Sequence, residues 1–152
     1  MSLRERFTTE LKEAMKSGDK AKVGAVRLIT AEMKNKDVEA RGAGKGEASE
    51  EDILGVLQKM IKQRQESAGI YEQNARPELA AIEHAEIAII TGFLPKQLGE
   101  DDVKAAIQAA IAETGASSMK DMGKVVASLR AQFAGQMDFG KASGLVKAAL
   151  GS

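Results

Sequence analysis

Apolar residues recur at intervals of three and four positions along most of the chain, which is the spacing of one face of an α-helix. Four such runs occupy the first part of the sequence, over about residues 3–17, 20–39, 50–71 and 78–91. Three more follow at about residues 100–114, 118–129 and 138–150. No window alternates polar with β-branched residues, as a half-buried strand would. The pattern therefore predicts an all-α fold.

Residues that begin or end helices stand at the borders of these runs. Residues 49–52 and 118–121 each have the Ser-x-x-Asp pattern of a capping box, so they predict two helix starts. The other signals are aspartates suited to the N-cap, a proline suited to the first turn, and glycines suited to the end of a helix. They are Asp19, Asp138, Pro77, Gly18 and Gly115.

Residues 93–98 (FLPKQL) separate the first four predicted helices from the last three. Pro95 cannot continue a helix and pushes Leu94 towards extended geometry, so the helical run must break here. Three large apolar side chains in so short a connector favour a joint packed against protein over a flexible tether. We therefore expect an N-terminal lobe of about four helices at residues 1–92, a packed hinge at 93–98, and a C-terminal three-helix bundle at 99–152.

The C-terminal lobe is predicted to be the weaker of the two. Its length is near the lower limit for an independently stable domain, and its expected core is modest. The helix caps of the two lobes are independent, so we expect each lobe to unfold as a cooperative part. The expected C-terminal core consists of Ile107, Ile111, Met122, Val125, Leu129, Leu145 and Leu150.

Composition excludes several classes of chemistry. The chain has 22 Lys and Arg against 22 Asp and Glu, so no overall field draws it to nucleic acid or to an anionic membrane. It contains no cysteine, which excludes disulfides, thiolate metal sites and cysteine nucleophiles. The amphipathic start at Met1 lacks a long apolar run, so we expect neither a signal peptide nor a membrane span, and we predict a cytoplasmic protein without a membrane partner.

Few residues are candidates for catalysis or cofactor binding. His84 is the only histidine, and it leaves the apolar stripe of its helix, which favours a partly exposed residue without a role in a Ser/His/Asp triad. The glycine-rich loop at residues 41–46 is not a Walker motif, because Lys45 is followed by Gly46 and no strand precedes it. We therefore assign no catalytic residue and no cofactor.

Arg64 stands in the middle of an apolar face of the third predicted helix. Glu83 and Glu86 interrupt the apolar stripe of the fourth predicted helix in the same way. The two carboxylates are one helical turn apart and could bind a divalent cation, but two carboxylates alone under-fill a calcium shell. We expect instead that one of them pairs with Arg64, because an unpaired charge on a buried face is costly, and we assign no metal site.

Basic residues cluster in three parts of the sequence, near residues 20–36, 59–64 and 120–147. Such residues are usually ordinary solubilising surface, although separate clusters can also converge into one surface that follows a phosphate backbone. Our candidates for RNA phosphate contacts come from these clusters and from the joint. They are Arg27, Lys34, Lys62, Arg64, Lys96, Lys120 and Lys124.

Five segments in this order and spacing resemble the GatB/YqeY family. They are residues 15–20 (MK and DK), 27–35 (RLI and AEMKN), 62–67 (KQR and ES), 93–98 (FLPKQL) and 121–125 (DMGKV). The resemblance implies a helical lobe followed by a three-helix tail. It also implies kinship with the C-terminal part of the B subunit of glutamine-dependent tRNA amidotransferase, a part that helps to hold tRNA. The catalytic body of that subunit has no counterpart in this sequence.

We expect an RNA-binding, and more narrowly tRNA-binding, accessory protein without catalytic activity of its own. One alternative is a protein-interaction adaptor whose apolar joint docks a partner helix. A second is a component of a tRNA transamidation complex, in which the resemblance implies a carbon–nitrogen ligase that uses glutamine as amido donor. The expected partners are tRNA or another structured RNA, and a tRNA-charging or amidotransferase protein.

Overall fold

The computed structural model describes residues 1–151, and within them the secondary structure is helical without strands. The prediction of an all-α fold is therefore confirmed. The elements in chain order are α1 (Leu3–Ser17), α2 (Lys20–Gly42), α3 (Glu50–Gln73), α4 (Pro77–Thr91), α5 (Glu100–Thr114), the short 3-10 helix η1 (Met119–Asp121), α6 (Met122–Phe133) and α7 (Phe139–Leu150).

Most of the predicted helix borders form as expected. Ser49 and Asp52 make a complete capping box at the start of α3, with each side chain accepting the backbone N–H of the other residue. Asp19 and Asp138 cap α2 and α7 by accepting backbone N–H groups. Gly18 ends α1 with φ of 73°, in the left-handed region where a side chain would be strained.

Two helix borders differ from the prediction. Helix α2 continues to Gly42, so the first two residues of the expected glycine-rich loop are helical. The capping box predicted at residues 118–121 does not form, because Ser118 makes no side-chain cap and residues 119–121 adopt a 3-10 turn. Asp121 instead accepts the backbone N–H of Ser117 at 3.0 Å.

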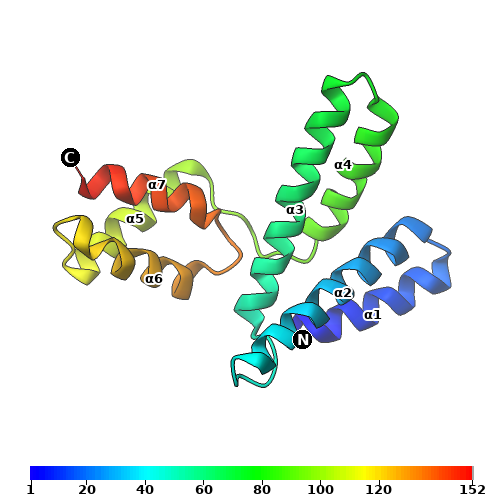
Figure 1. Cartoon of the computed structure of the whole chain (residues 1–152), viewed down its shortest axis with the longest axis horizontal. Coiled ribbons are helices and arrows are strands. Elements are labelled where there is room, and N and C mark those ends of the chain that lie inside the picture. Colours follow the sequence, from blue (N-terminus) through cyan, green and yellow to red (C-terminus); the bar gives the residue numbers. More distant parts are fainter. Residues whose placement is uncertain (152) are drawn as a thin grey trace. The chain divides into compact units, whose positions relative to one another are not determined.

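The chain forms two compact units, of which the first is Met1–Leu94. Helices α1 and α2 run side by side as one hairpin and α3 and α4 as another, and α2 also packs on α3 and α4 (Figure 1). Burial of apolar side chains between these helices is the main stabilising contribution. The core contains Leu3, Phe7, Val26, Ile29, Met33, Ala48, Ile53, Leu57, Met60, Ile90 and Phe93.

Two arginines of α1 fasten distant parts of this unit. Arg4 binds both carboxylate oxygens of Asp37 on α2 and also donates to the carbonyl of Ala48 in the α2–α3 loop. Arg6 donates to the carbonyls of Gly92 and Phe93, where α4 ends, and its guanidinium lies 5.2 Å from the Phe93 ring centre. Gly92 and Phe93 follow the last residue of α4, so no N–H of the helix reaches their carbonyls, and Arg6 supplies the missing hydrogen bonds.

The second unit begins at Pro95 and packs α5, α6 and α7 against one another. Its buried residues are Ile107, Ala110, Val125, Leu129, Met137, Ala142 and Val146. The expected core was right for Ile107, Val125 and Leu129 but wrong for Leu145, which is 42% exposed. The inward face of α7 is set by Ala142 and Val146, so Leu145 turns to the surface.

The apolar residues of the joint belong to the cores on either side of it. Phe93 is 2% exposed and packs edge-on against Phe7, with ring centres 5.0 Å apart. Leu94 packs against the core of the first unit and Leu98 against the core of the second. Phe93 is therefore not available to dock a partner helix, whereas Leu94 and Leu98 stay partly exposed, and the adaptor function stays a prediction.

Candidate nucleic-acid interface

The seven predicted RNA-binding residues are divided between the two units. Arg27 and Lys34 lie on α2, and Lys62 and Arg64 lie on α3, all in the first unit. The second unit holds the other three, with Lys96 before α5, Lys120 in η1 and Lys124 on α6. Six of the seven are exposed, and Arg64 is the exception.

Arg64 is already occupied within the protein. Its Nε donates to Oε2 of Glu86 at 2.6 Å, and its Nη1 donates to the carbonyl oxygen of Met60 at 3.1 Å. The prediction that Arg64 pairs with Glu83 or Glu86 is confirmed for Glu86. The two side chains are only 16% and 28% exposed, so the pair joins α3 to α4 in a partly desolvated place. Of the seven candidates, this guanidinium is the one that a phosphate would have to compete for.

Lys120 and Lys124 are both exposed, as expected. Lys120 lies in the 3-10 helix that precedes α6, and Lys124 lies in the first turn of α6, so the two lysines do not share one α-helix. Asp121, between them, has its pKa lowered, first by the hydrogen bond from the backbone N–H of Ser117. The charge of Lys124 contributes less to this shift, and neither Lys120 nor Lys124 forms an ion pair with a carboxylate among the described residues.

The described lysines and the arginine of the second unit are not used in ion pairs. In its described part, residues 95–151, no lysine or arginine forms an ion pair with a carboxylate. In the first unit, Arg4, Lys22, Lys36, Arg64 and Arg76 are paired, while the other described lysines and arginines form no ion pair with a carboxylate. The unpaired cations of the second unit are Lys96, Lys104, Lys120, Lys124, Arg130, Lys141 and Lys147.

The carboxylates of the second unit are used elsewhere. Asp138 accepts the backbone N–H groups of Gly140 and Lys141 at the start of α7, and Glu113 accepts from Gln132. Residues 100–102 place three acids in the first turn of α5, where the positive end of the helix dipole stabilises them. The described lysines of this unit are therefore without an ion-pair partner, whereas the Arg130 guanidinium lies over the Phe139 ring, 5.2 Å from its centre.

Sequence reasoning missed Lys104 as a member of this group. Lys104 lies on α5, two positions after the acidic residues 100–102. In the sequence it therefore looks like part of a helix face on which acids and bases alternate in solvent. The signal that distinguishes it is the position of the nearby acids in the first turn of α5, and the helix start predicted at about residue 100 already contained that signal.

A groove of about 730 Å³ lies on the surface of the second unit. Its apolar lining comes from Leu98, Val103, Met137, Ala142 and Leu145. Charged and amide side chains stand around it, among them Lys104, Lys141 and Gln97. The Gln97 amide donates to the carbonyl of Gly135 at 2.6 Å, which ties the segment before α5 to the turn before α7.

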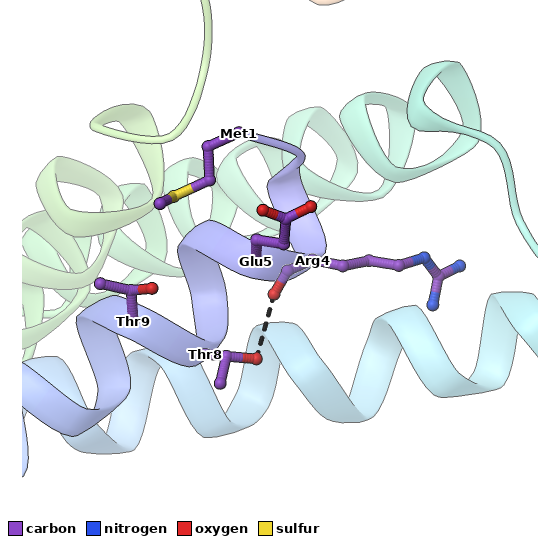
Figure 2. A pocket seen from close by; sticks show the side chains of 5 residues that line it. All are labelled: Met1, Arg4, Glu5, Thr8 and Thr9. Atoms are coloured by element: carbon purple, nitrogen blue, oxygen red, sulfur yellow. Dashed lines mark hydrogen bonds between the residues drawn. The ribbon is translucent and has the colours of Figure 1, made fainter.

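A shallower hollow lies at the start of α1, and Figure 2 shows the five residues that line it. The Arg4 side chain extends away from Met1 and Thr9, towards its partner Asp37, and the Thr8 hydroxyl donates to the Arg4 carbonyl at 3.1 Å (Figure 2). Few polar groups are left to converge on a ligand, so this hollow lacks the features of a binding site.

His84 is exposed, and its Nε2 donates a hydrogen bond at 2.8 Å to the carboxylate of Glu72 across the α3–α4 hairpin. This agrees with the expectation of a partly exposed helical histidine. Within residues 1–151, no three side chains of the metal-binding types come together. In the same range, no helix combines the length and the apolar character that crossing a membrane requires.

Curated proteins with similar sequences come from yeasts, and each is described as "Altered inheritance of mitochondria protein 41, mitochondrial". The chain is 32% identical over 85 residues to the proteins from Vanderwaltozyma polyspora and Saccharomyces cerevisiae, an alignment that covers 56% of this chain and 44% of each relative. The protein from Clavispora lusitaniae is 33% identical over 85 residues, with 56% and 47% covered. The chain thus matches slightly less than half the length of these relatives.

A family model described as "Yqey-like protein" matches residues 4–150, which include every helix in full except the first residue of α1. The match extends over both units and through the unpaired cations of the second. On this basis, the chain belongs to the YqeY-like protein family.

Proposed function

We propose that this protein is a non-catalytic RNA-binding accessory protein whose ligand is tRNA or another structured RNA. The observation that carries the proposal is the set of unpaired cations in residues 95–151, whose neighbouring carboxylates are committed to helix starts and to Gln132. An RNA backbone is a dense line of phosphates, and lysines that have no internal partner lose no ion pair when they bind it. Lys120 and Lys124 are the central phosphate contacts, and Lys96 is a third.

The scarcity of aromatic side chains favours folded RNA over single strands. The chain has no tryptophan and one tyrosine, Phe7 and Phe93 are buried in the core of the first unit, and Phe133 and Phe139 are partly buried against the core of the second. Single-stranded bases are usually held by stacking on exposed aromatic rings. A surface of lysines without such rings recognises the shape and the phosphates of a folded RNA, so binding is only weakly selective for sequence.

The proposal is tested by titrating labelled total tRNA with the protein over a series of salt concentrations and measuring fluorescence anisotropy. Replacing both Lys120 and Lys124 by Gln should weaken binding. It should also flatten the plot of log affinity against log salt by up to about 1.8, because each phosphate contact contributes a slope of about 0.9. Wild-type protein that leaves tRNA unbound at micromolar concentration and low salt would refute the RNA-binding function.

A matched control comes from α1. Lys12 and Lys16 are exposed, four positions apart and free of ion pairs with carboxylates among the described residues. Replacing both by Gln removes the same charge from the same chain, but from the other unit. We expect this variant to retain the wild-type slope. An equal loss in both variants would mean that binding follows net charge and does not use the second unit in particular.

An adaptor function is the second candidate, and the groove on the second unit supports it. Leu145, Val103 and Leu98 offer apolar surface there for a partner helix, whereas Phe93 of the joint is buried. Helix docking depends little on salt, while phosphate binding weakens steeply with it. The same salt series therefore separates the two functions.

The relation to the amidotransferase B subunit and the transamidation complex belongs to this proposal as well. A tRNA-charging or amidotransferase enzyme would be the protein partner, and the chain would contribute RNA binding and no chemistry. Cytoplasmic localisation also stays a prediction, since the names of the yeast relatives describe those proteins as mitochondrial.

A further inference from the structure

Helix α2 has a second face whose residues are exposed in the described part of the chain. Its buried side carries Val26, Ile29 and Met33, which point into the core of the first unit. The opposite side carries Gly24, Leu28, Ala31, Asn35, Val38 and Gly42, all of them exposed. Two of these are large apolar residues, with Leu28 exposed by 46% and Val38 by 62%. This side of α2, residues 24–42, is the outer face discussed below.

The outer face has the spacing of a coiled-coil seam. Its members are separated by four, three, four, three and four residues, and every one of them is uncharged. In a heptad repeat lettered a to g, Leu28, Asn35 and Gly42 take the a positions, and Gly24, Ala31 and Val38 take the d positions. A lone Asn at an a position is a feature of parallel two-stranded coiled coils, in which it specifies register.

The charges along the two edges of the outer face have opposite signs. Arg27 and Lys34 lie at the g positions on one edge, and Glu32 and Glu39 lie at the e positions on the other. All four side chains are exposed. Glu39 has an ion pair with Lys36 on its own helix, at 3.1 Å, and its side chain remains 70% exposed. Arg27, Lys34 and Glu32 have no ion pair within the described residues.

This arrangement complements itself when two copies of α2 lie parallel. In a parallel pair, a g residue faces the e residue that comes five positions later on the other helix. Arg27 of one copy then meets Glu32 of the other, and Lys34 meets Glu39, each pair occurring twice by symmetry. In an antiparallel pair, edges of like charge would face each other. The charge pattern therefore selects both the partner and its direction.

We infer that the outer face of α2 is the interface of a parallel homodimer, in which α2 of one chain packs on α2 of a second copy. The small residues Gly24, Ala31 and Gly42 allow the two helices to approach closely, and a Cβ atom built on Gly24 or Gly42 would meet no other atom of its own chain within 4 Å. Leu28 and Val38 supply the apolar contacts. The seam spans fewer than three heptads, so the dimer is weak and depends on protein concentration.

The inference goes beyond the proposed function and does not rest on it. It assigns Arg27 and Lys34, two of the predicted RNA contacts, to pairing between copies, whereas the RNA proposal rests on Lys120 and Lys124 in the other unit. A dimer would present two copies of the second unit to one RNA. Either proposal can fail without the other.

Charge exchange tests the interface. The mass of the protein in solution is measured by sedimentation equilibrium from about 5 to 500 µM, a range that covers weak association. The single variants Arg27→Glu and Glu32→Arg should each weaken dimerisation about tenfold, because two attractive pairs become repulsive. The double variant, in which the charges are exchanged, should dimerise as wild type does. An equimolar mixture of the two single variants should form a heterodimer.

Cysteine crosslinking tests the direction, since the chain has no cysteine of its own. Val38→Cys brings two thiols together at one d level of a parallel pair, so mild oxidation should give a covalent dimer. Ile82→Cys, at an exposed apolar residue of α4, is the matched control and should stay uncrosslinked. Circular dichroism checks that each variant remains folded.

Three results would overturn the inference. A wild-type chain that is monomeric over the whole concentration range leaves the outer face to a helix of another protein. A dimer that is indifferent to the charge variants and to Val38→Asp uses a different surface. A dimer in which the single variants are weakened but the double variant is not restored lacks the pairing between Arg27 and Glu32.

Discussion

Asp37 should make the stability of the first unit depend on pH in the acid range. Its carboxylate accepts from Nη1 of Arg4 at 3.0 Å, from Nη2 of Arg4 at 2.6 Å and from the backbone N–H of Ala48 at 2.9 Å. The side chain of Asp37 is only 13% exposed. The bond from Arg4, and after it the bond from Ala48, lowers the pKa of Asp37 from 3.8 to about 2. Protonation of this carboxylate therefore opposes the folded state.

The size of the effect follows from the two pKa values. One pKa unit is worth about 1.4 kcal/mol, so a change from 3.8 to about 2 corresponds to about 2 kcal/mol of the free energy of unfolding. The Arg4 side chain is 28% exposed, and screening by solvent reduces the expected value to about 1–2 kcal/mol. The folded pKa is the lower one, so this stabilisation is fully present above about pH 4. It is lost as the pH falls through about 2.

The Asp37→Asn variant imitates the protonated carboxyl at every pH. Urea unfolding followed by far-ultraviolet circular dichroism should show it about 1–2 kcal/mol less stable than wild type at pH 7. The difference should shrink steadily below about pH 4. Asp102→Asn serves as the control, because Asp102 is exposed on α5 in the other unit and should give a small difference that does not follow this course.

Two outcomes would contradict this reasoning. If Asp37→Asn unfolds together with wild type at pH 7, the contacts with Arg4 and Ala48 contribute no net stability. If the difference is present at pH 7 but stays constant down to about pH 2.5, it arises from packing or altered hydrogen bonding and not from the charge of the carboxylate.

Two further predictions concern the α3–α4 hairpin and the second unit. Arg64→Ala should lower the free energy of unfolding by about 1–3 kcal/mol, because it leaves the partly buried carboxylate of Glu86 without a partner. Thermal unfolding that coincides with wild type would show that the pair contributes nothing to stability. A fragment of residues 95–152 should be helical by circular dichroism in cold buffer, since α5, α6 and α7 enclose a core that includes the fully buried Val125 and Leu129. A fragment without helical signal would show that the two units fold only together.

Local physical chemistry made the helices predictable from the sequence. A capping box joins residues three positions apart, and an amphipathic face repeats within one or two turns, so both are written in short stretches of chain. Ser49 with Asp52, Asp138 at the start of α7, and Gly115 at the end of α5 all behave as their spacing predicts. The exception is Ser118, where the predicted capping box does not form and the carboxylate of Asp121 accepts the backbone N–H of Ser117.

The candidate site was predictable only in part. We predicted an ion pair because Arg64 and Glu86 each interrupt an apolar helix face, and the two residues form one. Which glutamate is chosen depends on the register of α3 against α4, which the sequence of neither helix contains. The same limit applied to Ile82. It belongs to an apolar stripe in sequence yet is 56% exposed, because the packed side of α4 is set by Ala80, Ile87 and Ile90.

Only the tertiary structure decided which charges are neutralised. Arg4 reaches Asp37 and Ala48 across distances in sequence that no periodicity spans, and this brings α1, α2 and the α2–α3 loop together. In the sequence, the acids beside Lys104 and Lys120 look like ion-pair partners. In the fold, residues 100–102 occupy the first turn of α5, and Asp121 accepts the backbone N–H of Ser117. Equal numbers of acidic and basic residues gave the sequence no net field. The fold separates those charges into paired and unpaired sets, because pairing depends on which side chains meet in space.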